Sequence, residues 1–292
     1  MLHDDISRRA ATDFSRARLK GFMNRIRSSV SGRPNELLSY EQVRECLHLG
    51  GPIYRGVEIV PLDAIVGSLN RYQDFDRAFM PLKNGTANRW ENVDLAHYQH
   101  KDLPPVVLYK VRDAYFVVDG HHRVSVARKQ GLEDIDAEVR ECSCRVKITP
   151  ELKPEDLVIL SEKVEFLERT HLDRLRPRSR VRLTLIGGFD RMLEHIAVHR
   201  YFMGIDLKRE ISEEEAVTHW YDTVYLPIVK IIRDSKVLRE FPGRTEGDMY
   251  LWVLDRQQYL SQEEGRVLQP PEDAARRFIE SGDYWDDDQA IR

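Results

Sequence analysis

The chain has 292 residues, of which 41% are hydrophobic and 32% charged, so it can bury a substantial core in two units or in one domain with large additions. Its formal net charge of −4 excludes a nucleic-acid-binding protein that is basic throughout, so any contact with DNA would require a local patch of positive charge. Three cysteines are too few for a disulfide framework, and no apolar run approaches the length of a membrane span. We therefore expect a cytoplasmic protein that has no membrane partner.

Residues 1–50 are expected to form a basic helical arm. Eight Arg and Lys side chains stand against three Asp between positions 1 and 33, and apolar residues such as Phe14 and Phe22 recur at helical spacing. One interpretation is an arm that contacts nucleic-acid phosphates, and the other is a helix that packs its apolar face on a domain and leaves its arginines in solvent. The candidate nucleic-acid residues are Arg16, Arg18, Lys20, Arg25 and Arg27.

Residues 51–150 are expected to form the central domain. The sequence predicts a strand over Gly56–Val60, a second strand over Val106–Tyr109 and a hairpin at Val111–Ala114. Between the two strands, His97 and His100 have the spacing of two metal ligands on one helix. No third ligand stands at a recognisable distance, so no metal site is predicted.

The stretch Ala114–Gly131 predicts a strand, a tight turn and a helix. It opens with a β-branched, aromatic and apolar run that ends at Asp119, and Gly131 stands where a helix C-cap glycine is expected. The first backbone N–H groups of a helix have no partners within the helix, which favours an anion at that end. Gly120 would let the backbone approach a phosphate closely, and Arg123 could add a bidentate contact. This corner is therefore a candidate phosphate site.

Titratable side chains are concentrated at the same corner. Asp119 could hold a metal-bound water or accept a proton, or it could only cap the following helix. His121 or His122 could act as acid, base or hydrogen-bond donor to phosphate near neutral pH. These three residues are the candidate catalytic groups.

Four segments in this part of the chain share their order and spacing with one superfamily: Val57–Ile65, Asn70-Arg71, Gly120–Ala127 and Ile135–Val139. Together they resemble the ParB/sulfiredoxin superfamily, with Gly120 and Arg123 at the glycine and arginine of its Gly-x-x-Arg box. The resemblance extends roughly from Gly51 to Ile148. It implies an α+β fold, in which a ParB/sulfiredoxin-like mixed sheet is flanked by helices.

The resemblance implies a phosphate or nucleotide site. It does not imply one particular activity, because the superfamily includes CTP-binding partition proteins, sulfiredoxins, free-serine kinases and proposed nucleases. It implies a nucleoside triphosphate, CTP or ATP, with or without Mg²⁺. The implied ligands are Gly120, His121, His122, Arg123 and Arg71. His121 replaces the catalytic cysteine of sulfiredoxins, which disfavours that activity. The glutamate of the CTP-type box is absent, so the identity of the nucleotide stays open. The His-Glu pair of the kinases is also absent, which weakens a kinase assignment.

Residues 151–292 are expected to form a mainly α-helical domain. Apolar periodicity predicts helices from Leu157 onward, over Phe189–Met203 and over Met249–Leu260, and a capping box at Ser212 opens a further helix with a kink at Pro227. In the arginine-rich segment 172–186, arginines alternate with apolar residues after Pro177, which predicts a loop that leads into a strand.

These features together predict a bacterial ParB-like nucleotide-binding protein that acts in a DNA-linked regulatory process, hydrolyses a nucleoside triphosphate and forms a homodimer. The alternative is a small-molecule kinase of the free-serine-kinase type or a ParB-like nuclease.

Overall fold

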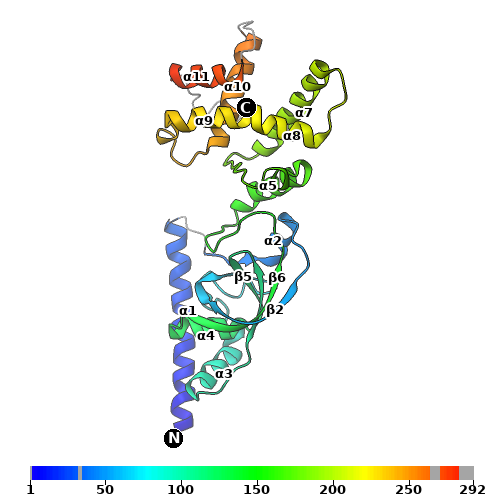
Figure 1. Ribbon diagram of the computed structural model, residues 1–292. Coiled ribbons are helices and arrows are strands. Elements are labelled where there is room, and N and C mark those ends of the chain that lie inside the picture. Colours follow the sequence, from blue (N-terminus) through cyan, green and yellow to red (C-terminus); the bar gives the residue numbers. More distant parts are fainter. Residues whose placement is uncertain (1, 32–34, 264–269, 283–292) are drawn as a thin grey trace. The chain divides into compact units, whose positions relative to one another are not determined.

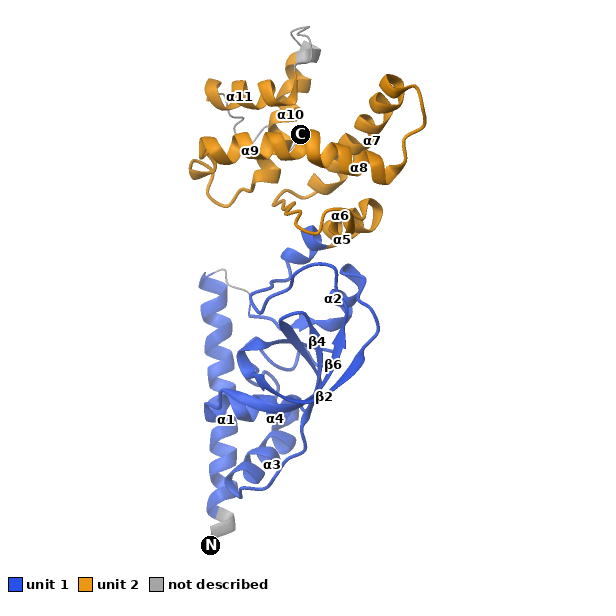
Figure 2. Cartoon of the chain, viewed as in Figure 1, with its two compact units in different colours: residues 1–160 blue, residues 161–292 orange. Residues whose placement is uncertain are grey.

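The computed structural model describes residues 2–31, 35–263 and 270–282 (Figure 1). The described chain divides into two compact units, residues 1–160 and 161–292, which are coloured separately in Figure 2. The boundary falls inside one helix, α5 (Asp156–Thr170). No helix in the described part of the chain is both long and apolar enough to cross a membrane.

The first unit combines one mixed sheet with flanking helices. Its strands are β1 (Leu38–Ser39), β2 (Ile53–Pro61), β3 (Ile65–Ser68), β4 (Val106–Val111), β5 (Ala114–Asp119) and β6 (Asp134–Cys142). Its helices are α1 (Leu2–Ser31), α2 (Tyr40–Cys46), α3 (Ala87–Tyr98) and α4 (His121–Gln130), with 3-10 turns at Leu62–Ala64 and Asn84–Thr86.

The strand order is β1-β3-β5-β4-β6-β2. Strands β1, β3 and β5 run parallel to one another, and so do β4 and β6, whereas the β4·β5 and β6·β2 pairs are antiparallel. The predicted strands and the hairpin between β4 and β5 are confirmed. The α+β class with a mixed sheet and a helical C-terminal region is therefore confirmed.

Helix α4 packs on one face of this sheet through Val124 and Ala127, which join a core that includes Leu108 and Val117. On the other face Tyr40 of α2 contacts the rings of Tyr109 and Phe116, at centroid distances of 4.8 and 5.7 Å. These two layers hold the sheet, and with it the ends of its strands, in a fixed position.

The second unit is helical. Its elements are the main part of α5, α6 (Leu172–Leu175), α7 (Gly188–Leu207), α8 (Glu213–Trp220), a π-helical turn (Tyr221–Tyr225), α9 (Leu226–Ser235), a 3-10 turn (Val237–Arg239), α10 (Glu246–Glu263) and α11 (Pro271–Ser281). The predicted cap is confirmed, because Ser212 Oγ accepts the backbone N–H of Glu215 at 3.2 Å. The irregularity expected at Pro227 is the π-helical turn directly before α9, which fits the loss of a backbone donor at proline.

The strand predicted before Ile186 is wrong. Residues 176–187 contain no strand, although Val181 and Leu183 are buried in the alternating manner of one. The backbone N–H groups of Thr184 and Leu185 donate to the carboxylate of Asp248, at 2.8 and 3.3 Å, and not to a neighbouring strand. A buried side chain thus takes the place of a sheet partner.

Candidate functional site

The candidate site lies where β3 and β5 end side by side. The two strands are parallel, so their carboxyl ends reach the same edge of the sheet, which is where open α/β sheets place their ligand crevices. Ser68 is the last residue of β3, and its Oγ lies 2.7 Å from Nε2 of His121, the first residue of α4. The same oxygen accepts the backbone N–H of Arg71 at 3.0 Å. One buried hydroxyl therefore joins the end of one strand to the helix that follows the other.

Gly120 forms the turn between β5 and α4 with φ of 96°. A Cβ at this position would lie 2.5 Å from Cγ1 of Val106, so the backbone approaches the neighbouring strand too closely for any side chain. Gly120 also supplies no side-chain cap to the first N–H groups of α4. This end of the helix consequently keeps the electropositive character that favours an anion.

Arg123 contacts other parts of the protein, whereas its position in the sequence suggested a bidentate contact with a phosphate. Its guanidinium donates to the carbonyl oxygens of Pro104 and Pro105, the latter at 2.9 Å, and its Nη2 lies 2.6 Å from Oδ2 of Asp119. The Arg123 side chain is only 14% exposed, whereas that of Asp119 is 72% exposed. The structure thus brings Asp119 and Arg123 together as an ion pair that braces the turn.

His121 and His122 both contact the ring of Phe75. His121 is buried and stacks on Phe75 at a centroid distance of 6.3 Å, and His122 meets the same ring edge-on at 5.6 Å. Burial, followed by the positive charge of Arg71, lowers the pKa of each imidazole to about 4. Both side chains are therefore neutral at physiological pH.

Arg71 is the cation that remains available at this corner. Its Nη1 lies 3.5 Å from Nε2 of His122, at the limit of a hydrogen bond, and no carboxylate of the described residues lies within ion-pair distance of it. Arg89, an exposed residue of α3, also lowers the pKa of His122 and so adds positive potential at the same place. The arrangement of a helix N-terminus, two arginines and a neutral imidazole can hold an oxyanion.

Ser68, Phe75 and Arg89 belong to the site but were not predicted from the sequence. Ser68 and His121 are 53 positions apart, and no motif connects them. Arg89 follows an Asn-Gly turn signal that predicts only a loop. The fold alone brings these residues together.

A cavity of about 900 Å³ adjoins the segment after Arg71. It lies between α1 and residues 72–83, and its polar lining includes Arg25, Ser28, Tyr72, Gln73 and Lys83. Phe75 lines this cavity and also contacts both histidines, so the cavity adjoins the site.

The five basic residues of the expected arm all lie on α1 and are exposed. The helix packs on the first unit through Ala17 and Phe14, whose ring lies 5.6 Å from that of Trp90. Arg18 donates to Asn84, and Arg16 lies 3.9 Å from Asp13. Helix α1 is therefore a packed element with exposed basic side chains. In the described residues, no group of three or more His, Cys, Asp or Glu side chains could hold a metal ion.

Comparison with known proteins gives a family match for part of the first unit. Residues 59–153 match the family model of the ParB N-terminal domain. This segment is a ParB-type domain. Among solved structures, the chain is similar to sulfiredoxin from Arabidopsis thaliana, with 21% identity, a TM-score of 0.24, and coverage of 30% of this chain and 89% of that one. No curated protein matches the chain. The family assignment confirms the resemblance to the ParB/sulfiredoxin superfamily.

Proposed function

We propose that the ParB-type domain binds a nucleoside triphosphate, CTP or ATP, through its phosphates at the turn between β5 and α4. The observation that carries this proposal is the position of Arg71, which has no carboxylate partner in the described residues and lies beside His122 at the uncapped start of α4. A guanidinium in this setting is suited to a phosphate oxygen, and the backbone N–H groups of the helix start would complete the contact.

The roles of the remaining residues follow from their contacts. Gly120 and the Asp119·Arg123 pair hold the turn, and His121 positions the start of α4 through Ser68. The neutral His122 can share a hydrogen bond with a phosphate without repelling Arg71. The cavity beside Phe75 has room for a base and a ribose, and its lining offers amide, hydroxyl and phenol groups.

A calorimetric titration of the full chain with CTP, ATP and the diphosphates, each with and without Mg²⁺, tests this proposal. We expect one triphosphate to bind and Arg71→Ala to weaken its binding about ten-fold or more, as for the loss of a charge-assisted contact. Arg140→Ala is the matched control, because Arg140 is a partly exposed arginine of β6 that pairs with Glu138. No binding of any nucleotide, or equal effects of the two variants, would contradict the proposal.

Hydrolysis or phosphoryl transfer is a separate step at the same site. Asp119 is the exposed carboxylate there and could orient a water or an acceptor hydroxyl, with Mg²⁺ held mainly by the nucleotide. Release of inorganic phosphate would indicate an NTPase. Transfer of the phosphoryl group to a small hydroxylated acceptor would favour the kinase alternative, and cleavage of DNA would favour the nuclease.

A second candidate function, binding to DNA, is favoured by the five exposed basic residues of α1. Fluorescence anisotropy with duplex DNA at 50 and 200 mM salt tests it, because contacts to phosphates weaken steeply with salt. We expect binding at low salt that Arg25→Gln and Arg27→Gln together reduce. Arg55→Gln, on β2, is the control. Absence of binding at low salt would remove this function.

A further inference from the structure

The second unit contains a cleft of about 550 Å³ between helices α7 and α8. One side of α7 forms a wall of this cleft, because its lining residues recur three or four positions apart from Leu193 to Ile205. Helix α8 adds Ala216 and Val217, and the last turn of α5 adds Arg169. All of these residues belong to the second unit, and the volume is that of a small-molecule site.

The floor of the cleft is apolar. Ile196, Ile211 and Ala216 line it and are buried, none of them more than 7% exposed. Nearer the surface, Tyr201 and Ile205 also line the cleft, although they are 67% and 53% exposed. A ligand with an aliphatic chain would cover these side chains, and burial of apolar area is favourable.

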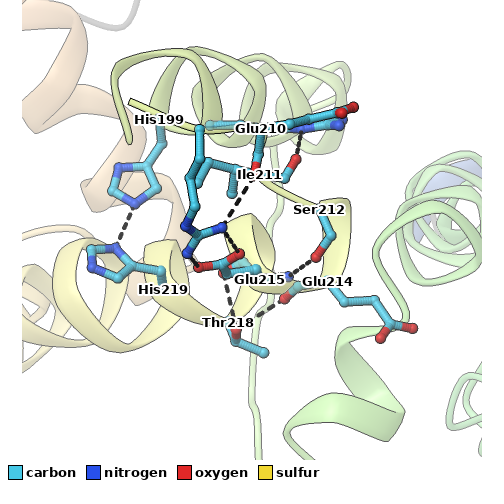
Figure 3. Close-up of polar contacts among 10 residues, drawn as sticks. His199, Glu210, Ile211, Ser212, Glu214, Glu215, Thr218 and His219 are labelled. Atoms are coloured by element: carbon cyan, nitrogen blue, oxygen red, sulfur yellow. Dashed lines mark hydrogen bonds and ion pairs between the residues drawn. The ribbon is translucent and has the colours of Figure 1, made fainter. Parts of the chain in front are cut away.

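Contacts between the helices fix the width of the cleft. His199 of α7 and His219 of α8 face each other with Nε2 and Nδ1 2.8 Å apart (Figure 3). Directly after α7, Arg209 makes a two-armed ion pair with Glu215 of α8, one arm at 2.9 Å. The walls are therefore held in place without a ligand, which lowers the entropy lost on binding.

Three arginines line the cleft, and they differ in their contacts. Arg200 donates to Glu213 at 3.3 Å, and Arg209 is paired with Glu215. Arg169 is exposed and makes no hydrogen bond or ion pair with the described residues. Its guanidinium can therefore make a bidentate contact with a carboxylate of a ligand.

The loop between α7 and α8 also brings a carboxylate, Glu210, to the cleft. Two guanidinium groups donate to the carbonyl oxygens of this loop, Arg209 to that of Glu210 at 3.1 Å and Arg200 to that of Ile211 at 2.6 Å. These neighbouring positive charges oppose an ammonium group beside Glu210. The lining consequently favours an anionic head group at Arg169.

We propose that this cleft binds a small aliphatic carboxylate, with its chain on Ile196, Ile211 and Ala216 and its carboxylate at Arg169. The corner between β5 and α4 belongs to the first unit, so the two proposed sites are tested separately.

Calorimetric titration of the full chain with hexanoate, octanoate and decanoate tests the apolar part of the proposal. We expect all three to bind, with affinity rising about three-fold for each added methylene that is buried. Octanol and octylamine, which carry a neutral and a cationic head group on the same chain, should bind more weakly than octanoate.

Arg169→Gln tests the head group. It should weaken the binding of octanoate about ten-fold or more, as for the loss of a charge-assisted contact, and leave the binding of octanol unchanged. Glu210→Gln is the matched control, because it removes the lining carboxylate and should not weaken octanoate.

Ala197→Phe tests the location, because Ala197 is an exposed lining residue of α7 and the larger ring would occupy the cleft. It should abolish binding of octanoate. Val198→Phe is the control, since Val198 is 55% exposed and does not line the cleft. Thermal unfolding of both variants without octanoate should match that of the wild type.

Four results would overturn the proposal. They are no heat of binding with millimolar octanoate, tighter binding of octylamine than of octanoate, an affinity that does not change with chain length, and equal effects of Ala197→Phe and Val198→Phe. Each would be obtained in the absence of nucleotide, so none depends on the site of the first unit.

Discussion

Two arginines, Arg71 and Arg123, lie at the corner between β5 and α4, and their different surroundings give them different roles. Arg123 is nearly covered and binds Asp119 and two prolyl carbonyls, so its removal would break the contacts that brace the turn. Arg71 borders a neutral imidazole and has no carboxylate partner in the described chain, so its removal leaves the internal contacts of the turn in place. Binding measurements should therefore use Arg71, because an effect of Arg123→Ala on binding would be confounded by loss of the turn.

Gly120 is expected to be the most sensitive glycine of the site. Gly120→Ala should lower the free energy of unfolding by about 2–4 kcal/mol, because the new Cβ meets Val106 and the residue must keep a positive φ. Gly131→Ala, at φ of 77° with open space around it, should cost only about 1–2 kcal/mol. Urea unfolding of both variants measures the difference. Equal losses would mean that the contact with Val106 carries no cost.

The two neutral histidines predict that acid destabilises the first unit. The unfolded chain takes up protons at the ordinary histidine pKa of 6.5, whereas folded His121 and His122 resist protonation until their pKa of about 4. Protons therefore favour the unfolded chain as the pH falls from about 6.5 to about 4, and the stability is fully present above that window. The loss is at most about 3 kcal/mol for each histidine.

Urea unfolding at pH 7.5, 6.0 and 5.0 checks this expectation. His122→Gln should flatten the dependence on pH, since glutamine keeps a polar side chain but does not titrate in this range. His48→Gln, which removes a histidine outside the site, is the control. An identical slope in the wild type and His122→Gln would contradict the assignment.

At the scale of elements, Asp248 joins the start of α10 to the segment before α7. It is fully buried and accepts hydrogen bonds from the backbone N–H groups of Thr184 and Thr245 at 2.8 and 2.7 Å and from both hydroxyls. Asp248→Ala should cost about 3–5 kcal/mol, because it leaves several partly buried donors without their acceptor.

Asp255→Ala is the matched control for this prediction. Asp255 lies two turns further along α10 and forms a partly exposed ion pair with Arg191 of α7. Its loss should cost about 1 kcal/mol or less. Thermal unfolding followed by circular dichroism compares the two, and a small effect of Asp248→Ala would show that water replaces its contacts.

The elements that local signals specify were predictable from the sequence. Gly120 and Gly131 mark both ends of α4, and both adopt the left-handed conformation that the pattern implies. The segment before Ile186 was mispredicted because a buried carboxylate and a neighbouring strand satisfy the same backbone donors, and alternation in the sequence does not distinguish them. The partners of Arg123 were not predictable, since the carbonyls of Pro104 and Pro105 reach it only through the pairing of β4 with β5.

At the scale of the whole molecule, the chain consists of two compact units. Differential scanning calorimetry should therefore resolve two transitions, one for each unit. Gly120→Ala should shift only the transition of the first unit, and Asp248→Ala only that of the second. One transition that moves with either variant would show that the units unfold together.

The hydrogen bond between Ser68 and His121 also bears on the order in which the protein folds. It closes a loop of 53 positions, and that loop contains α3, β4 and β5. Contacts between residues so distant in sequence form late, because the entropy of a long loop is lost before any contact compensates for it. A newly synthesised chain would thus acquire its helices early and the corner between β5 and α4 last.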